Sequence, residues 1–238
     1  MDDSFGRVAP EQADIPSEAV AGFLRQLREN EVNIHSFCMM RGDKVFAEGY
    51  WEPFHNFQHR MYSVGKSFVS IAIGLLQEEG KLKISDGICG YFPDKLPPQG
   101  AHEFIAKTTI RDMLMMATPH ALTTYKRDGG DDWVKPFFTV TPSHYPGTVF
   151  SYDTSSSHVL AALVERLSGK PLMDYLRQKL AVLNLSPEAK FLPDPMGEDF
   201  GSVRVQVGFR DRYAAVSMKG FGETDLKLFN GYLSAARV

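Results

Sequence analysis

The sequence is poor in the residues that mark several classes of protein site. It has only 2 cysteines, Cys38 and Cys89, and they lack the paired spacing of a zinc site or a disulfide framework. Cys38 falls in a strand-like run, so we expect it to be a small residue of the core. The 7 histidines show no metal-ligand spacing on a recognisable helix, and the chain has no glycine-rich phosphate loop. We therefore expect neither a bound metal nor a cofactor.

Charge of one sign and long hydrophobic runs are also lacking. The formal net charge is -3, which provides no basic surface for nucleic acid. No apolar run approaches the roughly 20 residues of a membrane span. Residues 1–4 are acidic and polar, without the basic and apolar regions of a secretory signal. These features predict a cytoplasmic protein with no nucleic-acid partner and no membrane span, and they leave its oligomeric state open.

A Ser-x-x-Lys motif, Ser63 to Lys66, precedes a segment with helical periodicity. Residues 67–79 carry an apolar stripe made by Phe68, Ile71, Ala72, Leu75 and Leu76. Three residues span nearly one helical turn, so Ser63 and Lys66 would share a face. A serine hydroxyl needs a base to become a nucleophile, and a lysine kept neutral by burial can be that base. An isolated match of this kind is more often a helix turn with a solvated lysine.

A second motif, Ser151-Tyr152-Asp153-Thr154, follows the turn signal Pro146-Gly147. Behind it lies a segment with one apolar face, which ends at the helix stop signal Ser168-Gly169. Tyr152 is therefore expected on a short loop between a turn and a buried helix. Such a loop can project the phenol into a cleft, although a packed ring is the commoner position of a tyrosine.

Together these motifs resemble those of the serine β-lactamase and penicillin-binding-protein superfamily, and especially its class C-like branch of esterases, D-aminopeptidases and amide hydrolases. The resemblance extends over about residues 15–201. Further ordered matches lie at residues 62–67, 79–82, 84–86, 91–93, 109–114, 146–152 and 167–170. The resemblance implies an α+β fold of the β-lactamase/transpeptidase type, in which helices flank an antiparallel sheet beside an all-helical region.

The resemblance also implies roles for individual residues. Ser63 would be the acylated nucleophile, Lys66 its partner and Tyr152 the base. Thr154 stands where the family has Asn, and its hydroxyl can donate and accept hydrogen bonds but reaches less far. The expected function is a serine hydrolase that cleaves a small ester or amide and acts more as an esterase or amidase than as a β-lactamase. The alternative is a catalytically silent, penicillin-binding-like protein with a binding role.

Three further residues are candidates for substrate binding. In this superfamily the loop that holds His120 borders the entrance of the active site, although a loop histidine without a role is the commoner case. The insert at residues 121–136 often forms one wall of the cleft, which makes Tyr125 and Trp133 candidates for substrate selectivity. The alternative is a solvated surface loop in which Trp133 packs against the next helix and holds it in place.

The expected organisation is a single domain over residues 1–238. Residues 15–60 would supply a helix (17–30) and a hairpin (34–40 and 44–50), residues 61–200 a mostly helical part with both motifs, and residues 201–238 a divergent tail. Within the tail, residues 204–207 are typical of a short strand and residues 225–233 of a helical face. The family's third motif, a Lys-Thr-Gly or His-x-Gly strand, is not readable after Tyr152. We therefore expect a fold that is incomplete at its C-terminus, as in a truncated or frame-altered chain, and that lacks the second oxyanion donor.

Overall fold

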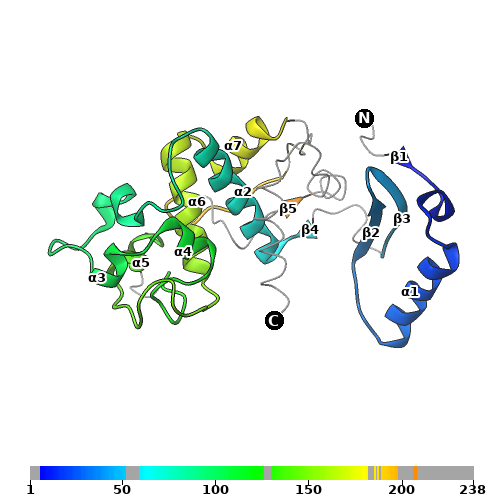
Figure 1. Cartoon of the computed structure of the whole chain (residues 1–238), viewed down its shortest axis with the longest axis horizontal. Coiled ribbons are helices and arrows are strands. Elements are labelled where there is room, and N and C mark those ends of the chain that lie inside the picture. Colours follow the sequence, from blue (N-terminus) through cyan, green and yellow to red (C-terminus); the bar gives the residue numbers. More distant parts are fainter. Residues whose placement is uncertain are drawn as a thin grey trace. The chain divides into compact units, whose positions relative to one another are not determined.

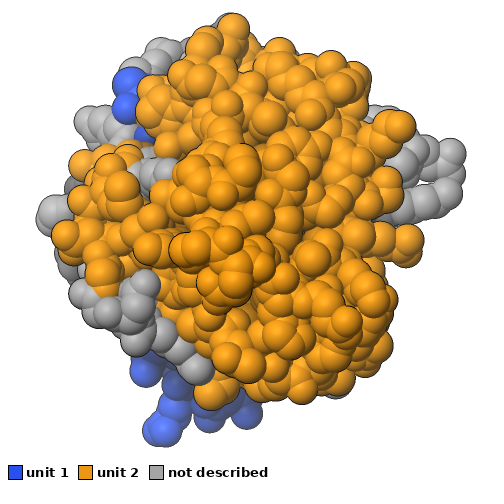
Figure 2. Space-filling model, turned by 90° about the vertical axis from the view of Figure 1, so that its left-hand side faces the viewer, with its two compact units in different colours: residues 1–59, 182–189, 207–219 blue, residues 60–181, 190–206, 220–238 orange. Residues whose placement is uncertain are grey.

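The computed structural model describes residues 6–51, 59–125, 130–181, 185, 187, 189–197 and 206–207. The chain divides into two compact units, coloured separately in Figure 2. The first consists of residues 1–59, 182–189 and 207–219, and the second of residues 60–181, 190–206 and 220–238. Both motifs lie in the second unit. The single domain stays a prediction, because two units that share interleaved segments of one chain can belong to one domain.

The first unit contains a small sheet and one long helix. The strands β1 (Gly6–Arg7), β2 (Ser36–Arg41) and β3 (Lys44–Tyr50) pair in the order β1-β3-β2, and α1 spans Ser17–Glu29. The hairpin of β2 and β3 is antiparallel as expected, and its turn contains Gly42 with a φ of 61°. However, β1 pairs parallel with β3, so the sheet is mixed and the expectation of an antiparallel sheet is wrong for this strand. The 3-10 helix η1 (Pro10–Ala13), α1 and β2 lie between β1 and β3, and a crossover connection of this length permits parallel pairing.

The two faces of the hairpin have different neighbours. Phe37 of β2 lies edge-on to Phe23 of α1, with ring centroids 6.0 Å apart. Cys38, the next residue, is exposed, so the expectation that it belongs to the core is wrong. Its partner across the hairpin is Glu48, whose carboxylate forms an ion pair with Arg7. Because paired residues share a face and faces alternate along a strand, Cys38 lies on the polar side of the hairpin.

The second unit is built around three helices, α2 (Gly65–Glu78), α6 (Thr154–Ser168) and α7 (Leu172–Lys179), which pack against one another (Figure 1). Residues 155–164 of α6 are all buried, which makes α6 the central helix of this unit. The helix ends at Gly169, whose φ of 70° gives the left-handed C-cap that the sequence predicts. The helices expected after both motifs are thus present, with bounds within two residues of the predicted ones where those were given.

Shorter elements lie before α2 and between α2 and α6. Before α2 comes η2 (Tyr62–Val64), and between α2 and α6 come η3 (Ile88–Tyr91), η4 (Pro93–Lys95), α3 (Glu103–Ala106), α4 (Ile110–Leu114) and α5 (Lys135–Thr139). A two-stranded sheet pairs β4 (His59–Arg60) with β5 (Gln206–Val207), where the sequence predicts a short strand. The predicted helical face at residues 225–233 lies outside the described residues. Among the helices that the structure describes, none has the length and hydropathy needed to cross a membrane.

Candidate functional site

The Ser-x-x-Lys motif lies where η2 passes into α2. The side chain of Ser63 is exposed, whereas Lys66, one turn further along, is only 3% exposed. Tyr62 precedes the serine with a φ of 46°, in the left-handed region that non-glycine residues rarely adopt. Such a conformation persists only where the surrounding structure enforces it. The chain therefore presents an exposed Ser63 in η2, three residues before a buried lysine.

The amine of Lys66 connects the two motifs. Its Nζ donates to Ser63 Oγ at 3.1 Å and to Thr154 Oγ1 at 3.5 Å. The same atom lies 5.0 Å from the centroid of the Tyr152 ring. The structure thus brings together four of the site residues that the sequence predicts, although residues 66 and 154 are separated by 88 positions in the chain.

Burial determines the charge preference of this amine. Removal from water lowers the pKa of Lys66 below its ordinary value of 10.5, because desolvation penalises the charged form. The hydroxyl of Tyr152 and the carboxylate of Asp153 oppose this shift without reversing it. A neutral lysine within hydrogen-bond distance of a serine hydroxyl can act as its base.

The loop that carries Tyr152 is fastened on both sides of the tyrosine. The N–H of Ser151 donates to the carbonyl oxygen of Met116 at 2.9 Å, and Ser151 Oγ donates to the carbonyl oxygen of Ala121 at 2.8 Å. On the other side, the N–H of Asp153 contacts Met116 Sδ at 3.4 Å. Tyr152 itself remains 54% exposed. The structure therefore holds the backbone while the phenol stands at the surface beside Lys66.

Asp153 was not among the predicted site residues. Its Oδ1 accepts the N–H of Ser155 at 2.8 Å and caps α6, while its Oδ2 accepts the hydroxyl of Thr118 at 3.3 Å. The side chain is fully buried, and burial raises the pKa of its carboxyl group. An aspartate directly before a helix is a known capping signal, and this signal could have identified the residue from the sequence. Its effect is to fix the first turn of α6, which carries Thr154.

His120 lies in the interior. It is 2% exposed, its Nε2 donates to the carbonyl oxygen of Phe137 at 2.9 Å, and its ring lies edge-on to the ring of Phe137. A contact between His120 and a substrate stays a prediction, and the burial of the ring favours a packing role.

Tyr125 and Trp133 form a pair of half-buried rings with centroids 5.4 Å apart. The structure thus brings these two candidates together, whereas residues 126–129 between them lie outside the described part of the chain. Within the described residues, no three His, Cys, Asp or Glu side chains are grouped so that they could hold a metal ion. The strand expected to carry the third motif would follow Tyr152, and after residue 197 the structure describes only residues 206–207.

Comparison with known proteins adds to this geometry. No curated protein matches the sequence. Among solved structures, a putative 6-aminohexanoate-dimer hydrolase from Bacillus anthracis has the same fold, with a TM-score of 0.66 and 17% sequence identity. The match covers 80% of this chain and 54% of that protein, so this chain spans about half of its length. The model of the Beta-lactamase family matches residues 26–197, which include Ser63, Lys66 and Tyr152. This chain therefore belongs to the Beta-lactamase family.

Proposed function

We propose that this chain is a serine hydrolase that cleaves a small ester or amide through an acyl-enzyme on Ser63. The observation that carries the proposal is the contact between the buried Lys66 amine and the exposed Ser63 hydroxyl at 3.1 Å. The name of the solved protein with the same fold, a hydrolase, supports hydrolysis as the class of reaction.

The proposed acylation begins with a proton transfer. The resemblance gives the role of base to Tyr152, but we assign the first proton transfer to Lys66 because its amine lies 3.1 Å from Ser63 Oγ. Neutral Lys66 takes the proton of Ser63 Oγ as this oxygen bonds to the substrate carbonyl carbon. Tyr152 passes a proton to the leaving alcohol or amine when the tetrahedral intermediate collapses, and the proton held by Lys66 replaces it. Water then attacks the acyl carbon and gives one proton to neutral Lys66. This proton passes to Ser63 Oγ as the bond between Oγ and the acyl carbon breaks, which releases the acid and restores Ser63. Thr154 Oγ1, which lies 3.5 Å from Lys66 Nζ, helps to hold the amine during both steps.

We further propose that simple esters are better substrates than β-lactams. The threonine hydroxyl at position 154 is shorter than the amide that the family has there, so it gives less help in holding a substrate amide. An activated ester has a better leaving group and depends less on this contact. A kcat/KM for p-nitrophenyl acetate above that for a cephalosporin is the expected result, and the reverse order would refute the ranking.

Covalent labelling tests the nucleophile directly. A fluorophosphonate probe should add once per chain, as measured by intact mass, and peptide mapping should place the adduct on Ser63. Ser63→Ala should abolish labelling, whereas Ser67→Ala, in the next turn of the same segment, should leave it nearly unchanged. An adduct that persists in Ser63→Ala protein and maps to Ser67 would overturn the assignment.

The second candidate function is a catalytically silent protein that binds a ligand. Thr154 in place of Asn, together with the unreadable third motif after Tyr152, favours this function. The two candidates differ in turnover: a hydrolase releases product from p-nitrophenyl acetate continuously. A silent protein would form at most one stable adduct per chain with a labelled penicillin.

A further inference from the structure

Met116 occupies a position where the backbone favours glycine. It follows Met115, the C-cap of α4, and has a φ of 56°. Its N–H donates to the carbonyl oxygen of Met113 at 3.2 Å, and the N–H of Ala117 donates to the carbonyl oxygen of Asp112 at 2.8 Å. These two hydrogen bonds form a Schellman motif, in which the left-handed residue after the C-cap is usually a glycine. Because a side chain is strained in this conformation, such a residue persists where the surrounding structure holds its side chain.

The contacts that hold this side chain lie at its sulfur. Met116 is only 4% exposed, and its Sδ accepts the N–H of Asp153 and the hydroxyl of Ser156, both at 3.4 Å. Both donors belong to fully buried residues at the start of α6. A thioether is a weak acceptor, but a buried N–H without any acceptor is costly. A leucine would fill about the same volume and accept neither hydrogen bond.

The peptide group that joins Tyr152 to Asp153 is the one that the sulfur holds. The N–H of Asp153 is part of this group, so the contact with Met116 Sδ limits its rotation and with it the direction of the preceding tyrosine. The carbonyl oxygen of Met116 accepts the N–H of Ser151 on the other side of Tyr152 at 2.9 Å. The ring held in this way has its centroid 5.0 Å from Lys66 Nζ.

We propose that Met116 is a positioning residue whose sulfur orients Tyr152 toward the leaving group of the substrate. This rests on the proposed hydrolase function, in which Tyr152 passes a proton to the leaving alcohol. Proton transfer requires the two groups to lie within hydrogen-bond distance, so a small rotation of the peptide group after Tyr152 slows this step. Met116 acts through the backbone of Tyr152 and not on the reacting atoms.

Met116→Leu tests the role of the sulfur, and Met113→Leu is its matched control. Leucine keeps the apolar volume and removes the acceptor. Met113 is a fully buried methionine of α4, and within the described part of the chain its sulfur accepts no hydrogen bond. The measurement is kcat/KM for phenyl acetate divided by kcat/KM for p-nitrophenyl acetate. Both esters form the same acetyl-enzyme, but phenolate is the stronger base and depends more on the proton from Tyr152.

Met116→Leu should lower this ratio about tenfold, because a misplaced proton donor slows the loss of the poorer leaving group most. Met113→Leu should leave the ratio unchanged. Tyr152→Phe should lower the ratio at least as far, and the double variant with Met116→Leu should lower it no further, since both changes remove the same proton transfer. A merely structural role of Met116 would slow both esters by the same factor and leave the ratio as it was.

Hydrogen exchange gives a readout that needs no catalysis. The amide of Asp153 should exchange faster in Met116→Leu than in the unaltered chain or in Met113→Leu. Met116→Gln supplies an amide oxygen that can accept the same two donors, so it should keep both the slow exchange and the ratio. This variant keeps the proposal testable if Met116→Leu fails to fold.

The outcomes separate the two proposals. An active chain whose ratio is unaffected by Met116→Leu overturns the positioning role alone, and so does a double variant whose ratio falls below that of Tyr152→Phe. A folded Met116→Gln protein with a ratio as low as that of Tyr152→Phe overturns the role of the accepted hydrogen bonds. An unaltered chain that hydrolyses neither ester and takes no label at Ser63 overturns the proposed function, and the positioning role with it.

Discussion

The buried amine of Lys66 has two charge states, and only the neutral one can take a proton from Ser63. Because burial lowers its pKa below 10.5, the neutral form becomes populated at a lower pH than for a solvated lysine. The rate of fluorophosphonate labelling should therefore rise with pH and level off with an apparent pKa below 10.5. Labelling rates between pH 6 and 10 measure this.

Lys66→Arg is the matched variant for that experiment. An arginine keeps the positive charge but does not deprotonate in this range, so labelling should fall by on the order of 10³ and lose its pH dependence. A Lys66→Arg protein that retains both the rate and the pH profile would show that another group activates Ser63.

Tyr152 is predicted to move protons and not to stabilise the fold. The residue is 54% exposed, and Tyr152→Phe keeps its ring and removes only the hydroxyl. We expect kcat to fall by on the order of 10² or more, the usual contribution of a positioned acid or base. The free energy of unfolding should change by about 1 kcal/mol or less, the scale of one hydrogen bond. Full turnover combined with a sharp drop in melting temperature would instead make Tyr152 a structural residue.

Single residues differ in how well the sequence predicts their positions. The helical spacing places Lys66 beside Ser63, and the distance of 3.1 Å agrees with it. The burial of His120 and the exposure of Cys38 could not be predicted in the same way. Both depend on which neighbour covers one particular side of a segment, and local patterns do not contain that information.

At the scale of the element, helix ends follow local rules closely. Gly169 adopts a φ of 70° at the end of α6, where its missing Cβ avoids strain. Gly169→Ala should therefore lower the free energy of unfolding by about 1 kcal/mol. Chemical denaturation monitored by circular dichroism measures the effect.

Gly74→Ala provides the matched control for this substitution. Gly74 lies inside α2, and a Cβ at this position meets no atom within 4 Å. The same chemical change should therefore stabilise the protein by up to about 1 kcal/mol, since alanine has the higher helix propensity. Effects of the same sign at both positions would contradict the assigned role of the Gly169 cap.

Contacts between elements were less predictable than the elements themselves. The two residues of β1 are too few to show a strand periodicity, so its parallel pairing with β3 left no signal in the sequence. Ser155 Oγ accepts hydrogen bonds from the N–H groups of residues 124 and 125, and these bonds join a loop to a helix 30 or more positions away. Such pairings depend on tertiary packing, whereas the helices α2 and α6 show their own apolar periodicity.

At the scale of the whole molecule, the ordered motifs predicted the family from the sequence, and the family model confirms it over residues 26–197. The sequence does not predict the elements that follow residue 197, because the family's third motif is not readable there. Ion pairs join distant parts of the second unit. One pair joins η4 to α6, and another joins α7 to the end of α2.

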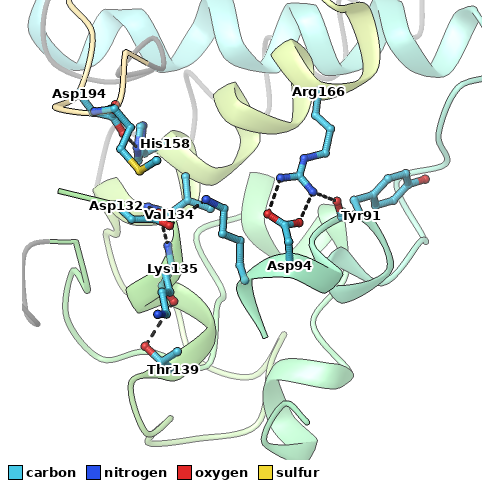
Figure 3. Close-up of polar contacts among 11 residues, drawn as sticks. Tyr91, Asp94, Asp132, Val134, Lys135, Thr139, His158, Arg166 and Asp194 are labelled. Carbon is cyan, nitrogen blue, oxygen red and sulfur yellow. Dashed lines mark hydrogen bonds and ion pairs between the residues drawn. The ribbon is translucent and has the colours of Figure 1, made fainter. Parts of the chain in front are cut away.

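Two of these links use carboxylates that are held in the charged form. Arg166 of α6 binds Asp94 of η4 and the carbonyl oxygen of Tyr91, and hydrogen bonding to Arg166 lowers the pKa of Asp94 to about 2 (Figure 3). At the end of α2, the hydrogen bond with Lys179 of α7 lowers the pKa of Glu79 to about 2. Both carboxylates therefore stabilise the folded chain only while they are ionised.

The direction of the pH effect follows from these two values. The ordinary pKa values are 3.8 for Asp94 and 4.5 for Glu79, so an unfolded chain takes up these protons before the folded chain does. The stabilisation is complete above about pH 4.5 and is lost as the pH falls through the folded pKa of about 2. The melting temperature should therefore fall progressively across this range.

Asp94→Asn isolates one of the two contributions. The variant should melt at a lower temperature than the unaltered chain at pH 6, and its melting temperature should fall less between pH 4.5 and pH 2 because one titrating group is gone. Both members of the Arg166–Asp94 pair are partly exposed, so 1 M salt should reduce the difference between the two proteins at pH 6. Parallel calorimetric scans of the two proteins at each pH provide the measurement. Equal slopes for both proteins would show that the Arg166–Asp94 pair does not contribute to the stability of the whole molecule.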